Sequence, residues 1–396
     1  MSIQSAVGHS DYVTEPFEAG QEIAQMVLGK LSLKSHSVGI LFCNIDFNFQ
    51  ELIKGIKSEL DIPIIGCTTA SEGNNDGYFE DSASLLVLTS DDTRIGTGMG
   101  TDLSKDARQA IDQATRQAMA GLNGEKPRLA LVFPDITMKP ISANVMLSQL
   151  VSILGPDVPI AGGLPADSFR FKTPFQFHDG QVLTDSFPIV LFSGAIDPTI
   201  ITRSGWIPVG EPARVTKSSA NVVHEIDGRP AIEYLKRYIP ESLDDPQMLA
   251  IYPLAILDDS LGADRSRYFV IRSAFSYDKD TGAVVYGGEV PENSTVQLAR
   301  GSRGDIIAGA TQAAQALGER VRSKDVQSVL FFSCAGRKMM LGPDTKKEVE
   351  ALLGEMPEGV AVNGFYSYGE IGAMDSFQDR LRSSQFHNCT MVLCAF

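Results

Sequence analysis

One order of apolar and helical segments occurs three times along the chain, and it constrains the fold more than any other feature. Each copy contains an apolar run, a stretch of helical length, a second apolar run with a glycine, and a third apolar run. The three copies open at residues 38–43, 129–135 and 328–334. Short apolar runs bounded by glycine and proline are typical of strands, and the stretches between them are long enough for helices. We therefore predict an α/β fold with mixed sheets, built from βαβ-like repeats.

A longer duplication includes the second and third copies and predicts two related lobes. Apolar side chains recur at helical spacing in residues 104–122, before the second copy, and in residues 304–321, before the third. Such spacing places them on one face of a helix. A turn signal, Asp-Gly at 227–228, lies between the two halves. We predict an N-terminal extension and two lobes, at residues 1–35, 36–230 and 231–396.

Composition excludes several classes of partner. The 396-residue chain has 34 basic and 49 acidic residues and a formal net charge of −15, so it repels nucleic-acid phosphates and anionic lipid. No apolar run approaches the roughly 18 residues of a membrane helix, and the N-terminus lacks the pattern of a signal peptide, so we expect no membrane insertion and a cytoplasmic location. Five cysteines form no C-x-x-C pair and no two of the five histidines stand four residues apart. Helical spacing therefore predicts no metal site.

Polar side chains gather where the predicted strands of the third copy end. Cys334 and Arg337 follow one strand, and Tyr366, Tyr368 and Glu370 lie at the end of the adjacent one. In α/β folds ligands bind at such strand ends. Arg337 suits a ligand carboxylate and Glu370 a ligand amine, which predicts a small ligand that carries both groups. The alternative is that Arg337 and Glu370 pair with each other.

The second copy offers a related loop. Gly162 and Gly163 end its middle strand, and Asp167 follows at nearly the spacing that separates Gly364 from Glu370. We therefore expect Gly162, Gly163 and Asp167 to contribute to ligand binding as well.

Catalytic motifs of the common hydrolase and nucleotide-binding types are absent. Cys334 becomes a reactive thiolate if a helix follows it and Arg337 faces it, and is otherwise an inert buried thiol. We predict a protein that is not an enzyme. A cysteine-dependent hydrolase that uses Cys334 with His387 is the alternative from a different functional class.

A series of motifs resembles the FIST family, in both its N-terminal and C-terminal parts. They include GCTTASEG, GGLPADSFRFKTPFQFHDGQV, SGWIPVG, VTKSSANVVHEIDGRPAIEYL, SCAGR, GFYSYGEIGA and FHNCTMVLCAF. The resemblance extends over about residues 36 to 396. On this basis the lobe at 36–230 corresponds to FIST N and the lobe at 231–396 to FIST C.

The resemblance implies an intracellular sensory protein of bacterial signal transduction that binds a small molecule. The chain also resembles stand-alone FIST proteins, some of which bind haem, sense nitric oxide and act on a partner histidine kinase. Haem is thereby implied as a cofactor. A histidine kinase, or a diguanylate cyclase or phosphodiesterase of cyclic-di-GMP signalling, is implied as the partner. A haem sensor needs an axial ligand, usually histidine, for which His387, His178 and His224 are candidates in that order. The alternative is a sensor of an amino acid or another small molecule without haem.

Overall fold

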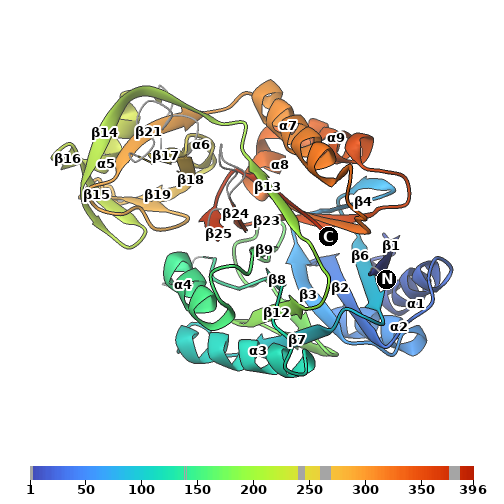
Figure 1. The fold of residues 1–396 in the computed structure, drawn as a ribbon. Helices are drawn as coiled ribbons and strands as arrows, with labels where there is room; N and C mark the ends of the chain where they lie inside the picture. Colours follow the sequence, from blue (N-terminus) through green and yellow to red (C-terminus); the bar gives the residue numbers. More distant parts are fainter. Residues whose placement is uncertain (1–2, 138, 140, 240–245, 259–268, 374–383) are drawn as a thin grey trace.

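Three six-stranded sheets with one repeated topology form the body of the molecule (Figure 1). The computed structural model describes residues 3–137, 139, 141–239, 246–258, 269–373 and 384–396. Each sheet has a parallel pair of strands at its centre and an antiparallel strand on either side of that pair. The mixed α/β class predicted from the sequence is therefore confirmed.

Each repeat runs through the same order of elements. The first repeat comprises β1 (Gln4–Ser10), α1 (Pro16–Leu28), β2 (His36–Asn44), α2 (Phe49–Glu59), β3 (Ile64–Thr69), β4 (Glu72–Asn74), β5 (Gly77–Phe79) and β6 (Ala83–Ser90). The second comprises β7 (Ile95–Gly100), α3 (Ala107–Gly121), β8 (Leu129–Val132), α4 (Ala143–Leu154), β9 (Ile160–Gly163), β10 (Gln176–His178), β11 (Gln181–Leu183) and β12 (Phe187–Phe192). The third comprises β13 (Thr199–Arg203), α7 (Arg303–Val321), β22 (Ser328–Cys334), α8 (Ala335–Leu341), α9 (Lys346–Glu355), β23 (Ala361–Ser367), β24 (Glu370–Ala373), β25 (Ser384–His387) and β26 (Met391–Ala395).

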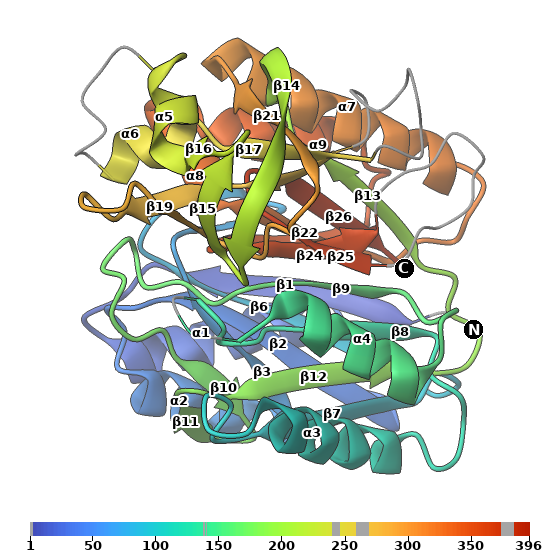
Figure 2. The same cartoon turned by 90° about the vertical axis from the view of Figure 1, so that its left-hand side faces the viewer.

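An antiparallel sheet is inserted into the third repeat between β13 and α7. Its elements are β14 (Ile207–Ser219), β15 (Val222–Ile226), β16 (Arg229–Pro230), α5 (Ala231–Lys236), α6 (Pro246–Ile251), β17 (Leu254–Leu257), β18 (Phe269–Arg272), β19 (Ala274–Tyr277), β20 (Val284–Tyr286) and β21 (Thr295–Arg300). β20 pairs with β19, while β18 pairs with β17. Figure 2 shows this sheet beside the third repeat, on the opposite side of the molecule from α3.

In each repeat one hairpin pairs with the sheet of another repeat; we call these the exchanged hairpins. The β4–β5 hairpin of the first repeat joins the third sheet beside β23, and the β24–β25 hairpin of the third joins the second sheet beside β9. The β10–β11 hairpin of the second repeat joins the first sheet beside β3. The exchange is cyclic, so the sheet hydrogen bonds themselves tie the three repeats together.

A cluster of phenylalanines lies where the three sheets meet. Phe42, Phe133 and Phe332 occupy matching positions on or just after the first parallel strand of each repeat, as the pairing register shows. The ring of Phe365 lies 4.5, 6.4 and 5.6 Å from theirs, centroid to centroid. All four side chains are fully buried. Their burial contributes a large hydrophobic area to the centre of the fold.

Alternating glycines on β7 explain the close packing of α3. A Cβ added to Gly96, Gly98 or Gly100 would lie 1.9 Å from a carbonyl oxygen of Ala118, Ala114 or Ala110 in this helix. Helix and strand therefore approach closely enough to exclude any side chain at these three positions. Of the described helices, none is long and apolar enough to cross a membrane.

The N-terminal segment is part of the first repeat. β1 pairs with β6 along seven residues, and α1 packs on α2, where a Cβ on Gly20 would lie 2.2 Å from the Leu52 carbonyl oxygen. Residues 4–28, which we had assigned to an extension, thus supply an edge strand and a covering helix. Their partner β6 lies some 80 positions further along the chain, so local sequence did not reveal the pairing.

Candidate functional site

A cavity of about 280 Å³ lies between the third repeat, a loop of the second repeat and the inserted sheet. The third repeat forms its floor, and the other two parts form its walls. The lining residues are Phe169, Phe171, Ala250, Ser273, Phe275, Cys334, Ala335, Gly336, Met339, Ser367, Tyr368 and Asn388. Two of the candidate residues from the sequence, Cys334 and Tyr368, are among them.

The floor of the cavity lies at the carboxyl ends of β22 and β23. Cys334 and Ser367 are paired there as the last residues of these parallel strands. The Ser367 hydroxyl donates to Glu370 Oε1 at 2.9 Å, and the hydroxyl of Thr390 donates to Glu370 Oε2 at 2.9 Å. Burial raises the pKa of Glu370 well above that of an ordinary glutamate, and the nearby Cys334 raises it further. The buried carboxyl group of Glu370 therefore keeps its proton to higher pH than an exposed glutamate does.

Cys334 is held as a neutral thiol. A hydrogen bond with the thiol of Cys389 raises the pKa of Cys334 well above its ordinary value, and burial raises it further. The sulfur of Cys389 in turn lies 3.1 Å from Ser273 Oγ of the inserted sheet. Because the thiolate is the nucleophilic form of cysteine, this environment gives Cys334 little reactivity at neutral pH.

Asp167 holds the aromatic wall. Its carboxylate accepts hydrogen bonds from the backbone N–H groups of Phe171, Lys172 and Thr173 at 2.9, 2.7 and 3.1 Å. It also accepts from the Tyr368 hydroxyl at 2.6 Å. All four bonds are made within the protein, so Asp167 positions the wall of the cavity and does not line it.

The position of Glu370 has counterparts in the other repeats. The first residue of each exchanged hairpin is Glu72, Gln176 or Glu370. Each of them pairs with the residue that follows a glycine in the neighbouring strand of the other repeat's sheet. Ser82, Thr390 and Ser186 donate to them in the same way. We had assigned Asp167 to this position by its spacing from Gly162. In the second repeat, however, residues 164–175 form a longer loop, which displaces Asp167 into the wall and leaves Gln176 at the equivalent place.

The two glycines of the second repeat serve close packing. A Cβ on Gly162 would lie 1.9 Å from the carbonyl oxygen of Val132, and one on Gly163 would lie 3.0 Å from the Cβ of Ser367. Gly163 stands opposite Glu370 in the β24–β9 ladder. These residues let the exchanged hairpin approach the floor, but neither lines the cavity.

Arg337 forms a buried ion pair with a residue that the sequence analysis did not consider. Its Nε lies 2.9 Å from Glu348 Oε1, and both side chains are fully buried. The remaining guanidinium nitrogens donate to the carbonyl oxygens of Ser204 and Ile306, the latter at 3.1 Å. Arg337 thus neither lines the cavity nor pairs with Glu370. With its donors engaged, it has none to offer a ligand carboxylate.

Tyr366 belongs to the Arg337 network. Its hydroxyl donates to Glu348 Oε2 at 3.0 Å, and its ring is fully buried. Ser333 donates to the same carboxylate oxygen at 3.0 Å. Glu348 therefore accepts hydrogen bonds from an arginine, a tyrosine and a serine, as a buried carboxylate requires.

The three candidate haem ligands lie apart from the cavity lining. His387 is buried on β25 with Nε2 3.2 Å from the Gly372 carbonyl oxygen, and burial lowers its pKa to about 4. His178 on β10 contacts Thr97 at 3.2 Å, and burial lowers its pKa too. His224 lies on β15 of the inserted sheet. A cavity without histidine and slightly smaller than typical ligand pockets does not fit an axially ligated haem.

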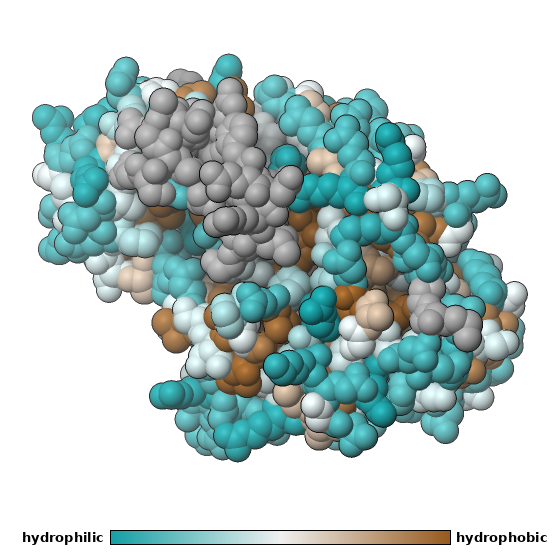
Figure 3. Space-filling view, in the orientation of Figure 1, coloured by the Kyte–Doolittle hydropathy of each residue, from teal (hydrophilic) through white to brown (hydrophobic). Residues whose placement is uncertain are grey.

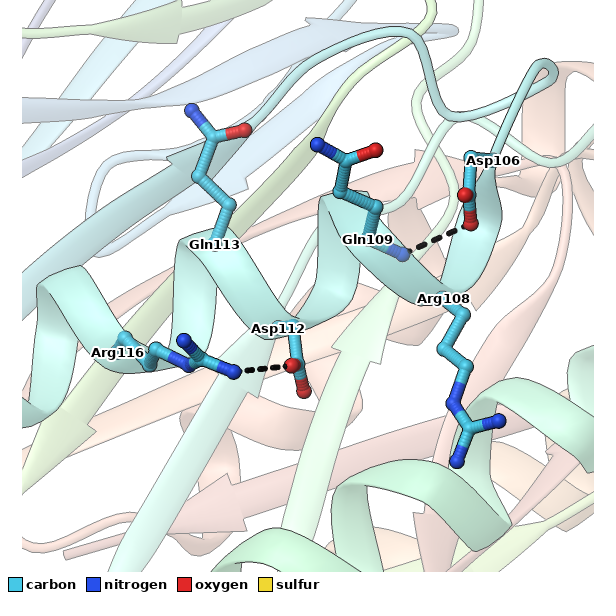
Figure 4. A pocket seen from close by; sticks show the side chains of 6 residues that line it. All are labelled: Asp106, Arg108, Gln109, Asp112, Gln113 and Arg116. Atoms are coloured by element: carbon cyan, nitrogen blue, oxygen red, sulfur yellow. Dashed lines mark hydrogen bonds and ion pairs between the residues drawn. The ribbon is translucent and has the colours of Figure 1, made fainter.

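In two other cavities, some of the charged side chains already pair with other residues of the protein. One of about 610 Å³ runs along the exposed side of α3 (Figure 4). There Arg116 pairs with Asp112 at 2.6 Å and the Asp106 carboxylate accepts the Gln109 backbone N–H. Exposed pairs of this kind are weak. Another, of about 370 Å³, includes Lys139, whose ammonium already bonds Asp135 and Asp185. Figure 3 shows that much of one face is hydrophilic, with small apolar patches.

Several lining residues were missed by the sequence analysis. Phe169 and Phe171 stand in the motif FRF, which begins two residues after Asp167, and Asn388 follows His387. Aromatic and amide side chains next to the candidate residues could have identified these three as further candidates for ligand binding. Ser273, Phe275 and Ala250 come from the inserted sheet and its helix, and no local pattern connects them with the third repeat.

Comparison with known proteins identifies two family domains. Residues 37–229 match the FIST N domain and residues 231–373 match the FIST C domain, which is consistent with the two lobes predicted. An uncharacterized protein of Mycobacterium tuberculosis H37Rv is 30% identical over 255 residues, 62% of this chain. Another, of Methanocaldococcus jannaschii, is 23% identical over 95% of this chain and 75% of its own. The matching region is 63% of the length of the mycobacterial relative.

A solved structure also aligns along the chain. The crystal structure of cyanuric acid hydrolase from A. caulinodans covers 100% of this chain and 99% of its own, with a TM-score of 0.37 and 9% sequence identity. Similarity at this level carries no argument about function.

Proposed function

We propose that this protein, which belongs to the FIST family through its FIST N and FIST C domains, is a sensor that binds a small molecule in the 280 Å³ cavity. FIST domains imply a sensory, ligand-binding role in signal transduction. The proposal adds the place of binding and the route by which binding is transmitted. Support comes from α8, which connects the cavity floor with the chain segments that carry the inserted sheet.

Helix α8 has two functional sides. Ala335, Gly336 and Met339 line the cavity. Arg337, on the same short helix, donates to the carbonyl oxygens of Ser204 and Ile306. Ser204 lies just before the inserted sheet begins at Ile207, and Ile306 lies just after the sheet ends at Arg300.

This connection gives ligand binding a mechanical consequence. A ligand that fills the cavity contacts both α8 and the inserted sheet, which supplies Ser273 and Phe275 to the wall. A bound ligand therefore favours the arrangement of α8 and the inserted sheet in this structure over arrangements that would separate them, and a partner protein would recognise the favoured arrangement. Such a ligand shifts the equilibrium only by its difference in affinity for the two states.

The partner and the location extend the proposal. We propose a cytoplasmic protein whose output is a partner histidine kinase, or a diguanylate cyclase or phosphodiesterase, as the FIST resemblance implies. The ligand-dependent arrangement of the inserted sheet would be what such a partner recognises. Its test is the activity of a purified partner with the protein and with its ligand-bound form.

Haem with nitric oxide is a narrower version of the proposal, and the lining of the cavity does not favour it. Absorption spectra with added haem test it, with His387→Ala, His178→Ala and His224→Ala beside the parent protein. We expect weak, non-saturating uptake that is alike in all four. A stoichiometric Soret band that shifts with nitric oxide and is lost in one variant would instead establish haem sensing and identify the axial ligand.

The experiment for ligand binding is a thermal-shift screen of a metabolite collection against matched glycine variants. Gly336→Leu fills the cavity, because an added Cβ there lies 3.5 Å from Cys334 Sγ, an ordinary contact. Gly354→Leu is the control on helix α9, where an added Cβ meets nothing within 4 Å. A ligand at 100 times its Kd adds about 2.7 kcal/mol of stability.

We expect at least one compound to stabilise the parent protein and Gly354→Leu but not Gly336→Leu. If no compound stabilises the protein, or every compound that does so acts equally on Gly336→Leu, the cavity is not the ligand site.

A further inference from the structure

We infer that the ligand of this cavity is a flat, uncharged aromatic molecule that carries both a hydrogen-bond donor and an acceptor. The inference rests on the proposed function and specifies the chemical class that the same site recognises. Three observations on the described residues support it: an aromatic wall held in a strained conformation, a lining without charged side chains, and two polar groups of opposite hydrogen-bonding character.

The aromatic wall is presented to the cavity and not withdrawn into the core. Phe171 stacks on Tyr368 with ring centroids 4.6 Å apart and an angle of 12° between the planes. Phe169 lies 6.4 Å from both of these rings. Phe171 is nevertheless 50% exposed and Phe169 36% exposed. Phe275 of the inserted sheet also lines the cavity.

The backbone of this wall adopts a rare conformation. Ser168, Phe169 and Phe171 have φ angles of 51°, 62° and 48°. Positive φ is unfavourable for bulky residues and persists only where the surroundings enforce it. Here the Asp167 carboxylate enforces it through the backbone hydrogen bonds to residues 171–173. Two phenylalanines held against strain in partly exposed positions indicate a rigid surface on which another ring can stack.

The described part of the lining carries no formal charge. None of the twelve described lining residues is lysine, arginine, histidine, aspartate or glutamate. Two ionisable groups lie nearby: Lys338 donates to the Ala70 carbonyl oxygen at 2.9 Å and lies 5.8 Å from the centroid of the Phe169 ring, and the carboxyl group of Glu370 is bonded by Ser367. A charged ligand would lose its hydration here without gaining an ion pair. The lining therefore selects an uncharged molecule.

Two polar side chains of the lining determine which hydrogen-bonding groups the ligand needs at its edge. Ser367 donates its proton within the protein, where Glu370 Oε1 at 2.9 Å and the Ser333 carbonyl oxygen at 3.3 Å are the acceptors, which leaves its oxygen lone pairs as an acceptor toward the cavity. Asn388 uses its amide oxygen to accept from the Ser273 backbone N–H at 3.3 Å, which leaves its NH₂ group as a donor. A planar carboxamide or a ring with adjacent N–H and C=O groups offers the complementary donor and acceptor.

Four probes of similar size separate these features. Benzamide is planar, uncharged and carries the donor and acceptor. Benzoate replaces the amide by an anion, benzamidine replaces it by a cation, and cyclohexanecarboxamide retains the amide but is not planar. Isothermal titration of the full chain gives the Kd of each. We expect benzamide to bind about tenfold or more tightly than the other three, because each lacks one matched feature.

Variants connect the preference with the wall and the floor. Phe171→Ala removes a half-exposed ring, so the protein stays folded, and we expect about tenfold weaker benzamide binding. Tyr12→Ala is the matched control, because Tyr12 is also a 52% exposed aromatic residue but does not line the cavity. We expect Tyr12→Ala to leave the Kd unchanged and Gly336→Leu to abolish binding.

The inference is overturned if benzoate, benzamidine or cyclohexanecarboxamide binds as tightly as benzamide, if none of the four saturates the protein, or if Phe171→Ala and Tyr12→Ala behave alike. The proposed function is judged separately by the metabolite screen. A charged or aliphatic compound that loses its effect in Gly336→Leu would overturn the ligand class and leave the sensor proposal intact.

Discussion

The first and third repeats place the same polar set at equivalent strand ends, and the difference between them lies in what surrounds that set. Glu72 is bonded by Thr69 and by Ser82, the latter at 2.7 Å, just as Glu370 is bonded by Ser367 and Thr390. Glu72, Thr69 and Ser82 are fully buried and line none of the cavities described above, and a Cβ on Gly73 would lie 2.8 Å from atoms of Phe331 and Val349. We call this set sealed. Beside Glu370, Ser367 faces the cavity.

The comparison indicates that the repeat itself provides only the buried polar set, and that segments added to the third repeat form the cavity. Two features distinguish the third repeat: the inserted sheet and the long 164–175 loop that the second repeat extends over it. Together they contribute Phe169, Phe171, Ser273 and Phe275 to the lining. A buried carboxyl group bonded by hydroxyls is thus a structural element of the repeat, and it gains a role in binding only where a cavity adjoins it.

The largest effect that tests this comparison is expected at Arg337. Arg337 occupies the position that the buried Phe47 has in the first repeat, because each lies three residues after the equivalent strand ends, at Cys334 and at Asn44. Arg337→Ala leaves the Glu348 carboxylate buried without its partner, which costs about 3–5 kcal/mol of unfolding free energy. Urea denaturation measures it. The double change Arg337→Met with Glu348→Leu should lose much less, because no buried charge remains. Equal losses in the two variants would contradict the assigned role.

The next effect concerns the pH dependence of stability. Burial raises the pKa of Glu72 to about 8, against hydrogen bonds from Thr69 and Ser82 that lower it. The native state therefore holds a proton that the unfolded state releases above pH 4.5. The contribution of Glu72 is fully present below that pH and is lost as pH rises toward 8, by about 1 kcal/mol per pH unit.

Glu72→Gln should remove this slope between pH 4.5 and 8, as measured by denaturation at several pH values. Glu370→Gln should act in the same direction, since burial raises the pKa of Glu370 as well. The two variants should differ in ligand binding: Glu370→Gln alters the partner of Ser367 and weakens benzamide binding, whereas Glu72→Gln does not. Weakening in both variants would show that the first repeat is not sealed.

A smaller effect is expected in thiol chemistry. Cys334 lines the cavity but has a raised pKa, so iodoacetamide should label it more slowly at pH 7 than it labels a free cysteine. Mass spectrometry identifies the labelled residue, and Cys334→Ala is the control. Benzamide should slow the labelling further by covering the cavity floor. Rapid labelling at pH 7, together with a turnover that Cys334→Ala abolishes, would favour the cysteine-dependent hydrolase instead.

Sequence alone predicted the local part of this account. Apolar runs and helical spacing identified the parallel strands, the helix between them and the last strand of each repeat, because burial patterns repeat every two or every 3.6 residues; they did not identify β1, α1 or the exchanged hairpins. The hairpin exchange was not predictable, since β24 pairs with β9 across some 200 residues. No periodicity within a segment carries that information.

The candidate cavity adjoins the strand ends that the βαβ pattern indicated near Cys334 and Tyr366, but Arg337 and Glu370, which we had assigned to a ligand there, do not line it. Arg337 was assigned to the ligand because Glu370 was the acid in the neighbouring motif, whereas its partner Glu348 lies eleven residues away on α9. The aromatic wall depends on an insertion in the second repeat, and only the folded chain brings that loop over the third.

Hydrogen exchange with and without saturating benzamide tests the central claim most directly, because it compares the two repeats in one experiment. We predict slower exchange in the loop 168–173, in α8 and in the segments that Arg337 connects, around Ser204 and Ile306. The first-repeat segment from β3 to β6 should be unchanged. Protection that appears around Glu72, or that spreads evenly over the three repeats, would contradict a ligand site confined to the third repeat.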